Sequence, residues 1–239
     1  MNRRRVLVLL ALAVAVAVLL LGPEALAQEE GGPEGESLLK LISYGGFIGY
    51  FTIFLSFVGI AFAIEHFINI RRDVLMPPEI VDQVEALFED GEYEEALQIC
   101  ESQPNYFTRV IANALPMVGT GFENVEQAAA RANDDEATKL FGKIGHINFI
   151  ANVAPMLGLF GTVSGMMFTF AVLANATEPP TPASLAGGIQ KAIVTTVIGL
   201  TVNIPMSGLF YYFRFRVIAM VTEISSVWRG LLERFREED

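Results

Sequence analysis

The chain of 239 residues contains a single cysteine, Cys100, and two histidines. One cysteine cannot form an intrachain disulfide. Neither His66 nor His146 has a second metal-binding residue at helical spacing, which argues against a zinc site. The sequence also lacks a P-loop, a nucleophile elbow and a zinc signature. We therefore expect no catalytic residues, no metal and no cofactor, and we do not expect an enzyme.

Basic residues are outnumbered, with 16 Lys and Arg against 27 Asp and Glu, and the net charge is −11. This balance argues against nucleic acid as a partner. The chain is 52% hydrophobic, with a mean hydropathy of +0.45. It is too apolar for an ordinary soluble domain and is typical of a multi-span membrane protein with one modest polar region.

Charged residues are absent from three long segments, Leu41 to Ile64, Ile147 to Thr177 and Ala192 to Phe213. About 20 apolar residues, rising about 1.5 Å each, cross the ~30 Å hydrocarbon layer as a helix. The sequence therefore predicts three transmembrane helices. A membrane proton relay normally needs a titratable group in the low-dielectric region, and these segments contain no Asp or Glu. If the chain moves protons, another chain must supply that group.

The first 27 residues have the pattern of a secretory signal. Arg3 to Arg5 form a basic start, Val6 to Leu21 an apolar core, and Ala25-Leu26-Ala27 a cleavage site. The competing interpretation is an uncleaved anchor helix, for which the apolar core is slightly short.

Loop charges predict the orientation. Arg71 and Arg72 follow the first span, Arg214 and Arg216 follow the third, and the connector between the second and third spans has no Lys or Arg. By the positive-inside rule, the mature N-terminus is outside and the C-terminus is in the cytoplasm.

The predicted fold is an all-α membrane protein, with three transmembrane helices after a cleaved signal peptide and long helices that extend into the cytoplasm. We divide the chain into a signal peptide (1–27), a periplasmic lead-in (28–40), transmembrane helix 1 (41–66), a cytoplasmic helical domain (67–145), transmembrane helix 2 (146–175), a periplasmic connector (176–187), transmembrane helix 3 (188–213) and a cytoplasmic C-terminal helix (214–239).

Two sequence patterns in the predicted cytoplasmic part indicate how its helices are arranged. From about Glu123 the helical pattern has no breaker before Pro155, which predicts one helix running into the second span. After the third span, apolar residues recur in a heptad-like stripe, at Val217, Val221, Ile224, Trp228, Leu231 and Phe235. The stripe either packs on its own loop domain or forms a helix ring between subunits.

Small and hydroxyl residues are concentrated in the second and third spans. Membrane Thr and Ser often bond back to their own helix, so Thr162, Thr195 and Thr196 either do this or face a polar path. We expect close helix packing at six positions: Gly158, Gly161, Gly165, Gly199, Pro155 and Pro205. Lys191 either faces a pore or reaches the outer head-group level.

Two motifs resemble those of the MotA/TolQ/ExbB proton channel family, with ExbB and TolQ as the nearest likeness. The first is Ala154-Pro155-Met156-Leu157-Gly158-Leu159-Phe160-Gly161-Thr162-Val163-Ser164-Gly165-Met166. The second comprises Leu185 to Ile189, Ala192 to Leu200, and Ile204-Pro205. With the first span and the helical loop, the resemblance covers about residues 38–220.

The resemblance implies a pentameric ring in the bacterial inner membrane around an ExbD- or TolR-like single-span partner that carries the proton-accepting Asp. It also implies energised work at the outer membrane, through a TonB-like protein in the ExbB case. By motif position, Thr162 and Thr196 match the family's pore-lining threonines. ExbB proteins commonly have Glu where this chain has Lys191, so no proton-relay role is carried onto Lys191. The departure implies a change in ion selectivity or gating, a pairing with an acidic residue of the partner, or a divergent subfamily. The alternatives are a TolQ-like role in envelope maintenance, a MotA-like stator, and a membrane scaffold that conducts nothing.

Overall fold

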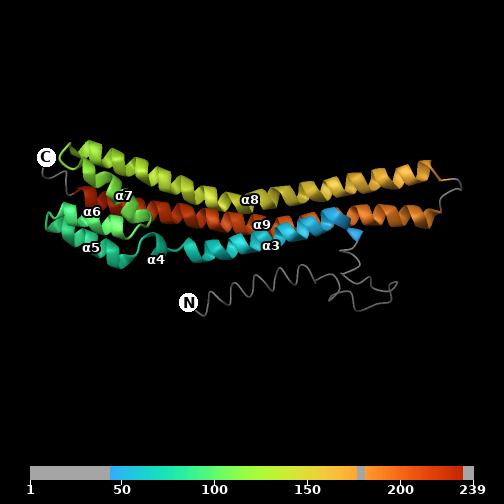
Figure 1. The fold of residues 1–239 in the computed structure, drawn as a ribbon, viewed down its shortest axis with the longest axis horizontal. Helices are drawn as coiled ribbons and strands as arrows, with labels where there is room; N and C mark the ends of the chain where they lie inside the picture. The colour runs from blue at the N-terminus through green and yellow to red at the C-terminus, as the bar shows by residue number, and fades with distance from the viewer. Residues whose placement is uncertain (1–43, 177–180, 234–239) are drawn as a thin grey trace. The chain divides into compact units, whose positions relative to one another are not determined.

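The computed structural model of the protein describes residues 44–176 and 181–233. Every regular element in these ranges is helical (Figure 1): α3 (Gly46–Asn69), α4 (Arg72–Leu75), α5 (Pro78–Glu89), α6 (Tyr93–Ser102), α7 (Tyr106–Ala114), the 3-10 helix η1 (Leu115–Met117), α8 (Phe122–Ala174) and α9 (Pro182–Leu232). The predicted all-α fold is therefore confirmed for this part of the chain. The expected signal peptide and lead-in lie outside the described residues.

Three of the described helices, α3, α8 and α9, are long and apolar enough to cross a membrane. This confirms the prediction of three spans. As the sequence pattern predicts, α8 runs without a break from Phe122 through Pro155 to Ala174. Pro205 lies inside α9 in the same way. Both prolines remove one backbone donor from a continuous helix, a loss that membrane helices tolerate when neighbouring groups compensate.

The chain divides into two compact units, and each of the long helices contributes to both. Of the described residues, unit 1 comprises 44–60, 147–176 and 181–208. Unit 2 comprises 61–146 and 209–233. Unit 1 therefore contains the apolar segments of α8 and α9, whereas unit 2 contains α4 to α7 and the ends of the long helices that continue beyond those segments.

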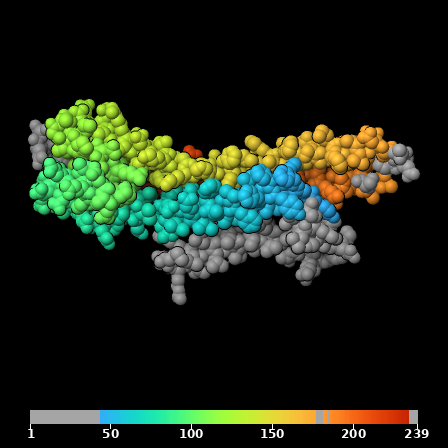
Figure 2. All heavy atoms as spheres, in the orientation of Figure 1, coloured from blue at the N-terminus to red at the C-terminus, as the bar shows by residue number. Residues whose placement is uncertain are grey.

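Unit 1 is packed on the inside and apolar on the outside. Ala154 of α8 and Met206 of α9 are almost fully buried. On the outer surface, Phe47 is 85% exposed and Phe168 is 72% exposed. Figure 2 shows the blue part of α3 lying beside the yellow part of α8. So much apolar surface is stable only against lipid or another apolar protein surface.

The helices α5, α6 and α7 pack against one another within unit 2. Val84, Ala96, Phe107 and Ile111 are fully buried. An Asn105–Thr108 capping box starts α7: Thr108 N donates to Asn105 Oδ1 at 3.0 Å, and Asn105 N donates to Thr108 Oγ1 at 2.8 Å. Each helix thus presents an apolar face to its neighbours.

The heptad-like stripe of α9 is covered within unit 2. Val217, Ile224, Trp228 and Leu231 are at most 4% exposed, Val221 is half-buried, and Phe235 lies outside the described residues. A buried amide, Asn133 of α8, fixes this contact: its Oδ1 accepts from Ser225 Oγ at 3.1 Å and from Trp228 Nε1 at 3.4 Å. Tyr106 Oη is 3.1 Å from the same oxygen and 2.9 Å from the Asn133 carbonyl. Of the two interpretations of the stripe, packing on the chain's own domain accounts for these four residues.

The two histidines also take part in packing within unit 2. His66 is buried, and its Nε2 is 3.0 Å from the carbonyl oxygen of Lys143. Its ring lies edge-on against Phe213, with centroids 5.6 Å apart. His146 Nδ1 is 2.9 Å from the same Lys143 carbonyl. No group of three or more metal-binding side chains occurs within residues 44–176 and 181–233.

Candidate functional site: the contact between α8 and α9 in unit 1

Glycines bring α8 and α9 close together. A Cβ atom on Gly199 would lie 2.5 Å from the carbonyl oxygen of Ala154, and one on Gly158 would lie 2.9 Å from the carbonyl oxygen of Thr195. Backbone cannot yield to such a contact as a flexible side chain can. A Cβ on Gly165 would lie 3.0 Å from Ala192 Cβ. Only a hydrogen fits at these positions, so the two backbones approach as small residues in membrane helices permit.

Gly161 is different, because its neighbour is a side chain. A Cβ there would lie 2.5 Å from Thr195 Oγ1 and 2.7 Å from Thr195 Cβ. Gly161 therefore makes room for Thr195, which is only 5% exposed. The small residue on one helix thus determines where a hydroxyl on the other can be buried.

Three threonine hydroxyls form a network across this contact. Thr162 Oγ1 and Thr196 Oγ1 are hydrogen-bonded to each other. The carbonyl oxygen of Gly158 is 3.1 Å from Thr162 Oγ1, 3.1 Å from Thr195 Oγ1 and 3.2 Å from Thr196 Oγ1. The carbonyl oxygen of Ala192 is 3.1 Å from Thr162 Oγ1 and 2.7 Å from Thr195 Oγ1. Each hydroxyl has one proton and more than one acceptor, so the donors can rearrange without moving the backbone.

Three other hydroxyls in unit 1 bond within their own helix. Ser164 Oγ donates to Gly161 O at 3.2 Å, and Thr201 Oγ1 donates to Val197 O at 2.9 Å. Ser207 Oγ donates to the side chain of Asn203 at 2.8 Å. This is the local arrangement common for membrane Ser and Thr. Thr162, Thr195 and Thr196 differ from these residues because they also bond from one helix to the other.

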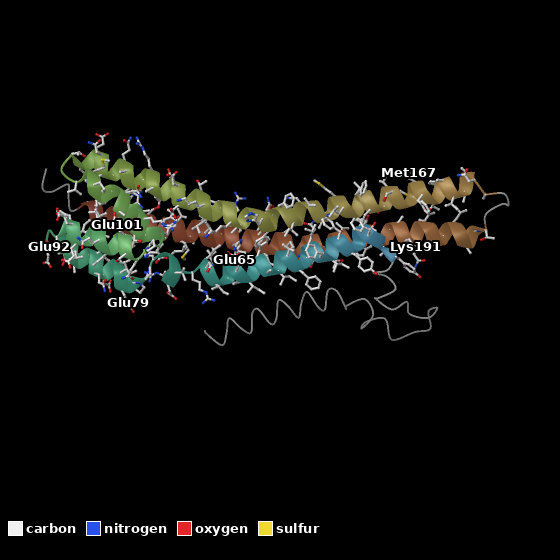
Figure 3. All side chains as sticks on the ribbon, viewed as in Figure 1. Glu65, Glu79, Glu92, Glu101, Met167 and Lys191 are labelled. Atoms are coloured by element: carbon white, nitrogen blue, oxygen red, sulfur yellow. The ribbon has the colours of Figure 1, made fainter. Side chains whose placement is uncertain are left out.

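Charge is almost absent from the described part of unit 1. Among its described residues (44–60, 147–176 and 181–208), Lys191 is the only charged side chain. Figure 3 labels Lys191 on α9, whereas the four glutamates labelled there belong to unit 2. Threonine hydroxyls donate and accept hydrogen bonds but do not ionise near neutral pH. The described part of unit 1 can therefore hold a polar path but contains no carboxylate to bind a proton.

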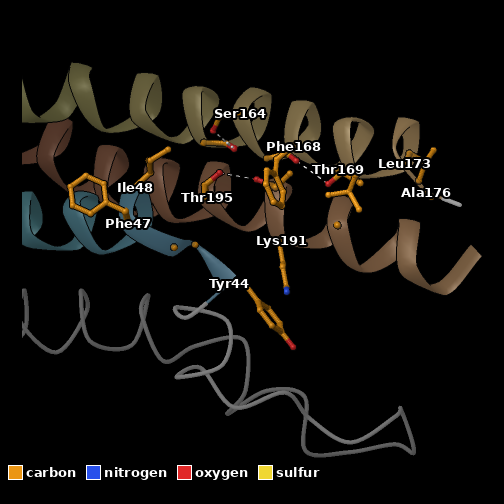
Figure 4. Close-up of a pocket in the computed structure, with 17 residues that line it drawn as sticks. Tyr44, Phe47, Ile48, Ser164, Phe168, Thr169, Leu173, Ala176, Lys191 and Thr195 are labelled. Carbon is orange, nitrogen blue, oxygen red and sulfur yellow. Dashed lines mark hydrogen bonds between the residues drawn. The ribbon is translucent and has the colours of Figure 1, made fainter. Parts of the chain in front are cut away.

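Lys191 lies at a separate pocket of about 550 Å³, formed by the start of α3 and by α8 and α9 (Figure 4). Its Nζ is 5.5 Å from the ring centroid of Tyr44. Thr195 also lines the pocket, whereas Thr162 and Thr196 do not. Lys191 thus faces the start of α3, away from the Thr162–Thr196 pair.

The sequence-based candidates do not include every residue at these sites. Gly188 was not among them, although a Cβ there would lie 2.6 Å from Thr169. Tyr44 was also missed. Its position at the start of the first span, where aromatic residues gather at the membrane surface, is a signal that could have identified it.

Comparison with known proteins identifies the relatives of this helix pair. Residues 100–226, which include both motifs, match the MotA/TolQ/ExbB proton channel family. A biopolymer transport protein ExbB homolog of Methanothermobacter thermautotrophicus is 30% identical over 192 residues, which is 80% of this chain and 68% of the relative. The chain belongs to the MotA/TolQ/ExbB proton channel family.

Two other members show the range of this family. The Tol-Pal system protein TolQ of Pseudomonas aeruginosa is 37% identical over 83 residues, 35% of this chain and 36% of TolQ. The MotAB structure of C. jejuni has a TM-score of 0.57 over 94% of this chain and 88% of the matched chain, at 17% identity. This structural likeness supports the MotA/TolQ/ExbB fold, while the sequence matches favour ExbB and TolQ as relatives.

Proposed function

We propose that this protein is the ExbB/TolQ-like subunit of a proton-driven motor in the bacterial inner membrane. It couples proton flow, together with a single-span partner like ExbD or TolR, to energised transport or other work at the outer membrane. It performs no chemical reaction of its own. The observation that carries this proposal is the hydrogen-bonded Thr162–Thr196 pair in a unit whose described residues contain no carboxylate.

The threonine network supports a role beside the proton path. A proton acceptor in the membrane must be a carboxylate or a similar group, and its charge is stabilised by nearby donors that can turn toward it. Thr162 and Thr196 are each half-buried, and each has a hydroxyl with alternative acceptors. They can therefore donate to a partner carboxylate when it is ionised and return to the Gly158 and Ala192 carbonyls when it is protonated.

The exposed apolar surface of unit 1 supports assembly with other chains. Met156, Phe160 and Met167 of α8 are each more than 60% exposed. In a ring of identical subunits, with the partner helix at its centre, part of this surface is covered by protein and the rest by lipid. A pentamer, as the family resemblance implies, is the assembly that we propose. In the ExbB case, a TonB-like protein receives the work.

The proposed topology places the mature N-terminus in the periplasm and the C-terminus in the cytoplasm, because arginines follow the first and third spans. Cleavage after Ala27 would give a mature chain that begins at Gln28. N-terminal sequencing of the purified protein tests this point, and a start at Met1 or Asn2 would exclude cleavage.

Proton-driven uptake in cells tests the role of the threonines. In the double variant Thr162→Val and Thr196→Val, side-chain shape is nearly kept and both hydroxyls are lost. We expect uptake to fall by at least about tenfold, the change that ~1.4 kcal/mol in a barrier produces. The matched control is Thr201→Val, because the Thr201 hydroxyl donates to the carbonyl oxygen of Val197 in its own helix. Uptake in cells that carry the Thr201→Val control should stay within about twofold of uptake with the unaltered protein.

The result also separates the alternatives. Unchanged uptake in the double variant, at equal abundance in the membrane, would favour a scaffold that conducts nothing. In cells that lack the gene, the unaltered protein could instead restore only envelope integrity or only motility. If the double variant fails to restore that same property, the pore serves a TolQ-like or a MotA-like role.

A further inference from the structure

The pocket at Lys191 shares Thr195 with the threonine network but is not lined by the Thr162–Thr196 pair. Its walls come from three segments of unit 1: residues 44–48 at the start of α3, Gly161 to Leu173 of α8 together with Ala176 just after that helix, and Gly188 to Thr195 of α9. Its volume of about 550 Å³ is within the range of small-molecule binding sites. Figure 4 shows Lys191 and Tyr44 together on one side of it.

The walls of the pocket are apolar in effect, although they contain hydroxyl groups. Ser164, Thr169 and Thr195 donate to carbonyls of their own helices, at 3.2, 2.9 and 2.7 Å. These hydroxyls have no proton left for a ligand while those bonds persist. The remaining walls include Phe47 and Phe168, which are 85% and 72% exposed. An occupant must therefore cover apolar surface.

Lys191 is the one charged residue among those that line this apolar pocket. The Lys191 ammonium lies over the Tyr44 ring, at 5.5 Å from its centroid, and its side chain is exposed. A tyrosine face attracts a cation but does not neutralise it. Lys191 is the only charged side chain among the described residues of unit 1, so that part of the chain offers it no carboxylate.

The position of Lys191 along α9 places its charge near a head-group layer. The 22 residues from Ala192 to Phe213 are uncharged and span about 33 Å, enough to cross the ~30 Å hydrocarbon core. Lys191 at one end and Arg214 at the other therefore lie close to the two membrane surfaces. A long basic side chain at that depth extends toward the lipid phosphates.

We propose that this pocket binds an anionic phospholipid, with the phosphate beside the Lys191 ammonium and an acyl chain against Phe47 and Phe168. A phosphodiester joined to a hydrocarbon chain matches both the lone cation and the exposed apolar wall. A protein carboxylate would satisfy the charge and leave the apolar wall uncovered. Thr162 and Thr196, the pair that carries the proposed function, do not line this pocket, so the lipid site can be tested without altering them.

Photo-crosslinking tests the proposal on the full-length protein. The protein is reconstituted in phosphatidylcholine vesicles that contain phosphatidylglycerol with a photoreactive group on its acyl chain, and the labelled peptides are identified by mass spectrometry. We expect labelling of peptides that contain Phe47 or Phe168. A juxtamembrane basic residue contributes about 1 kcal/mol to binding of anionic lipid, so Lys191→Gln should lower this labelling about fivefold. Lys191→Arg should keep it within about twofold, because the charge remains.

A matched control separates this site from general attraction to anionic lipid. Arg214→Gln removes one charge from the other end of the same span and should leave labelling at Phe47 and Phe168 unchanged. Equal labelling in Lys191→Gln and the unaltered protein, at the same native mass, would overturn the proposal. So would a carbodiimide cross-link between Lys191 and a protein carboxylate that persists in phosphatidylglycerol-rich vesicles, because it would assign the cation to a protein partner.

Discussion

Replacing Gly199 by alanine should separate α8 from α9. The new Cβ would lie 2.5 Å from the carbonyl oxygen of Ala154. A carbon and a carbonyl oxygen in favourable contact are about 3.3–3.6 Å apart, so the helices must move apart by about 1 Å. Because the obstacle is backbone, no change of side-chain rotamer relieves it.

The cost can be estimated from three effects. Overpacking of a close contact costs about 1–3 kcal/mol. The separation also weakens three hydrogen bonds between the helices. Thr195 and Thr196 donate to Gly158 O, and Thr162 donates to Ala192 O. Each such bond contributes about 0.6 kcal/mol, which gives ~2 kcal/mol together. The higher helix propensity of alanine offsets about 1 kcal/mol. The net expected loss is about 2–4 kcal/mol.

The assay measures unfolding in SDS by energy transfer between two labels. The labels are attached to cysteines that replace Met167 of α8 and Ile189 of α9, both of which are exposed, in a protein that also carries Cys100→Ala. Gly208→Ala is the matched control on the same helix, because a Cβ on Gly208 meets nothing within 4 Å. The control should be neutral or stabilised by up to about 1 kcal/mol. If the two variants unfold within about 0.5 kcal/mol of each other, the close contact inferred at Gly199 is wrong.

Two further predictions concern unit 2. Asn133→Ala removes the acceptor of Ser225 Oγ and Trp228 Nε1, while Tyr106 keeps its bond to the backbone carbonyl of residue 133. We expect the free energy of unfolding to fall by about 1–3 kcal/mol and the fluorescence of Trp228 to shift to the red. Unchanged emission and stability would contradict this account of the contact. Burial raises the pKa of the Cys100 thiol to about 12, so its thiolate is scarce up to strongly alkaline pH. A maleimide should label Cys100 only after unfolding, and rapid labelling of the folded protein at pH 8 would show that the thiol is accessible.

The helices of this protein are largely predictable from its sequence, because charge and apolar runs decide them directly. The uncharged segments predict α3 and the apolar parts of α8 and α9, and the lack of a breaker after Glu123 predicts that α8 is continuous. The stripe at Val217, Ile224 and Trp228 is predictable as a stripe. What covers it is not predictable, because periodicity describes one surface and says nothing of its partner.

The contacts between helices are less accessible to sequence reasoning. A short motif indicates that Gly161 and Gly165 permit close packing, but only the structure pairs Gly199 with the Ala154 carbonyl. Asn133 carries no special signal, since a single polar residue in a helix is usually exposed. Lys191 left two interpretations open because a helical sequence does not specify which neighbour a side chain faces. The structure directs it toward Tyr44.

The most direct test of the central claim is proton flux into vesicles that contain the purified protein, measured with and without its single-span partner. The account predicts that flux requires a partner whose membrane helix carries a carboxylate, and that replacing this carboxylate by its amide abolishes the flux. Full proton flux through the purified protein alone would contradict the account.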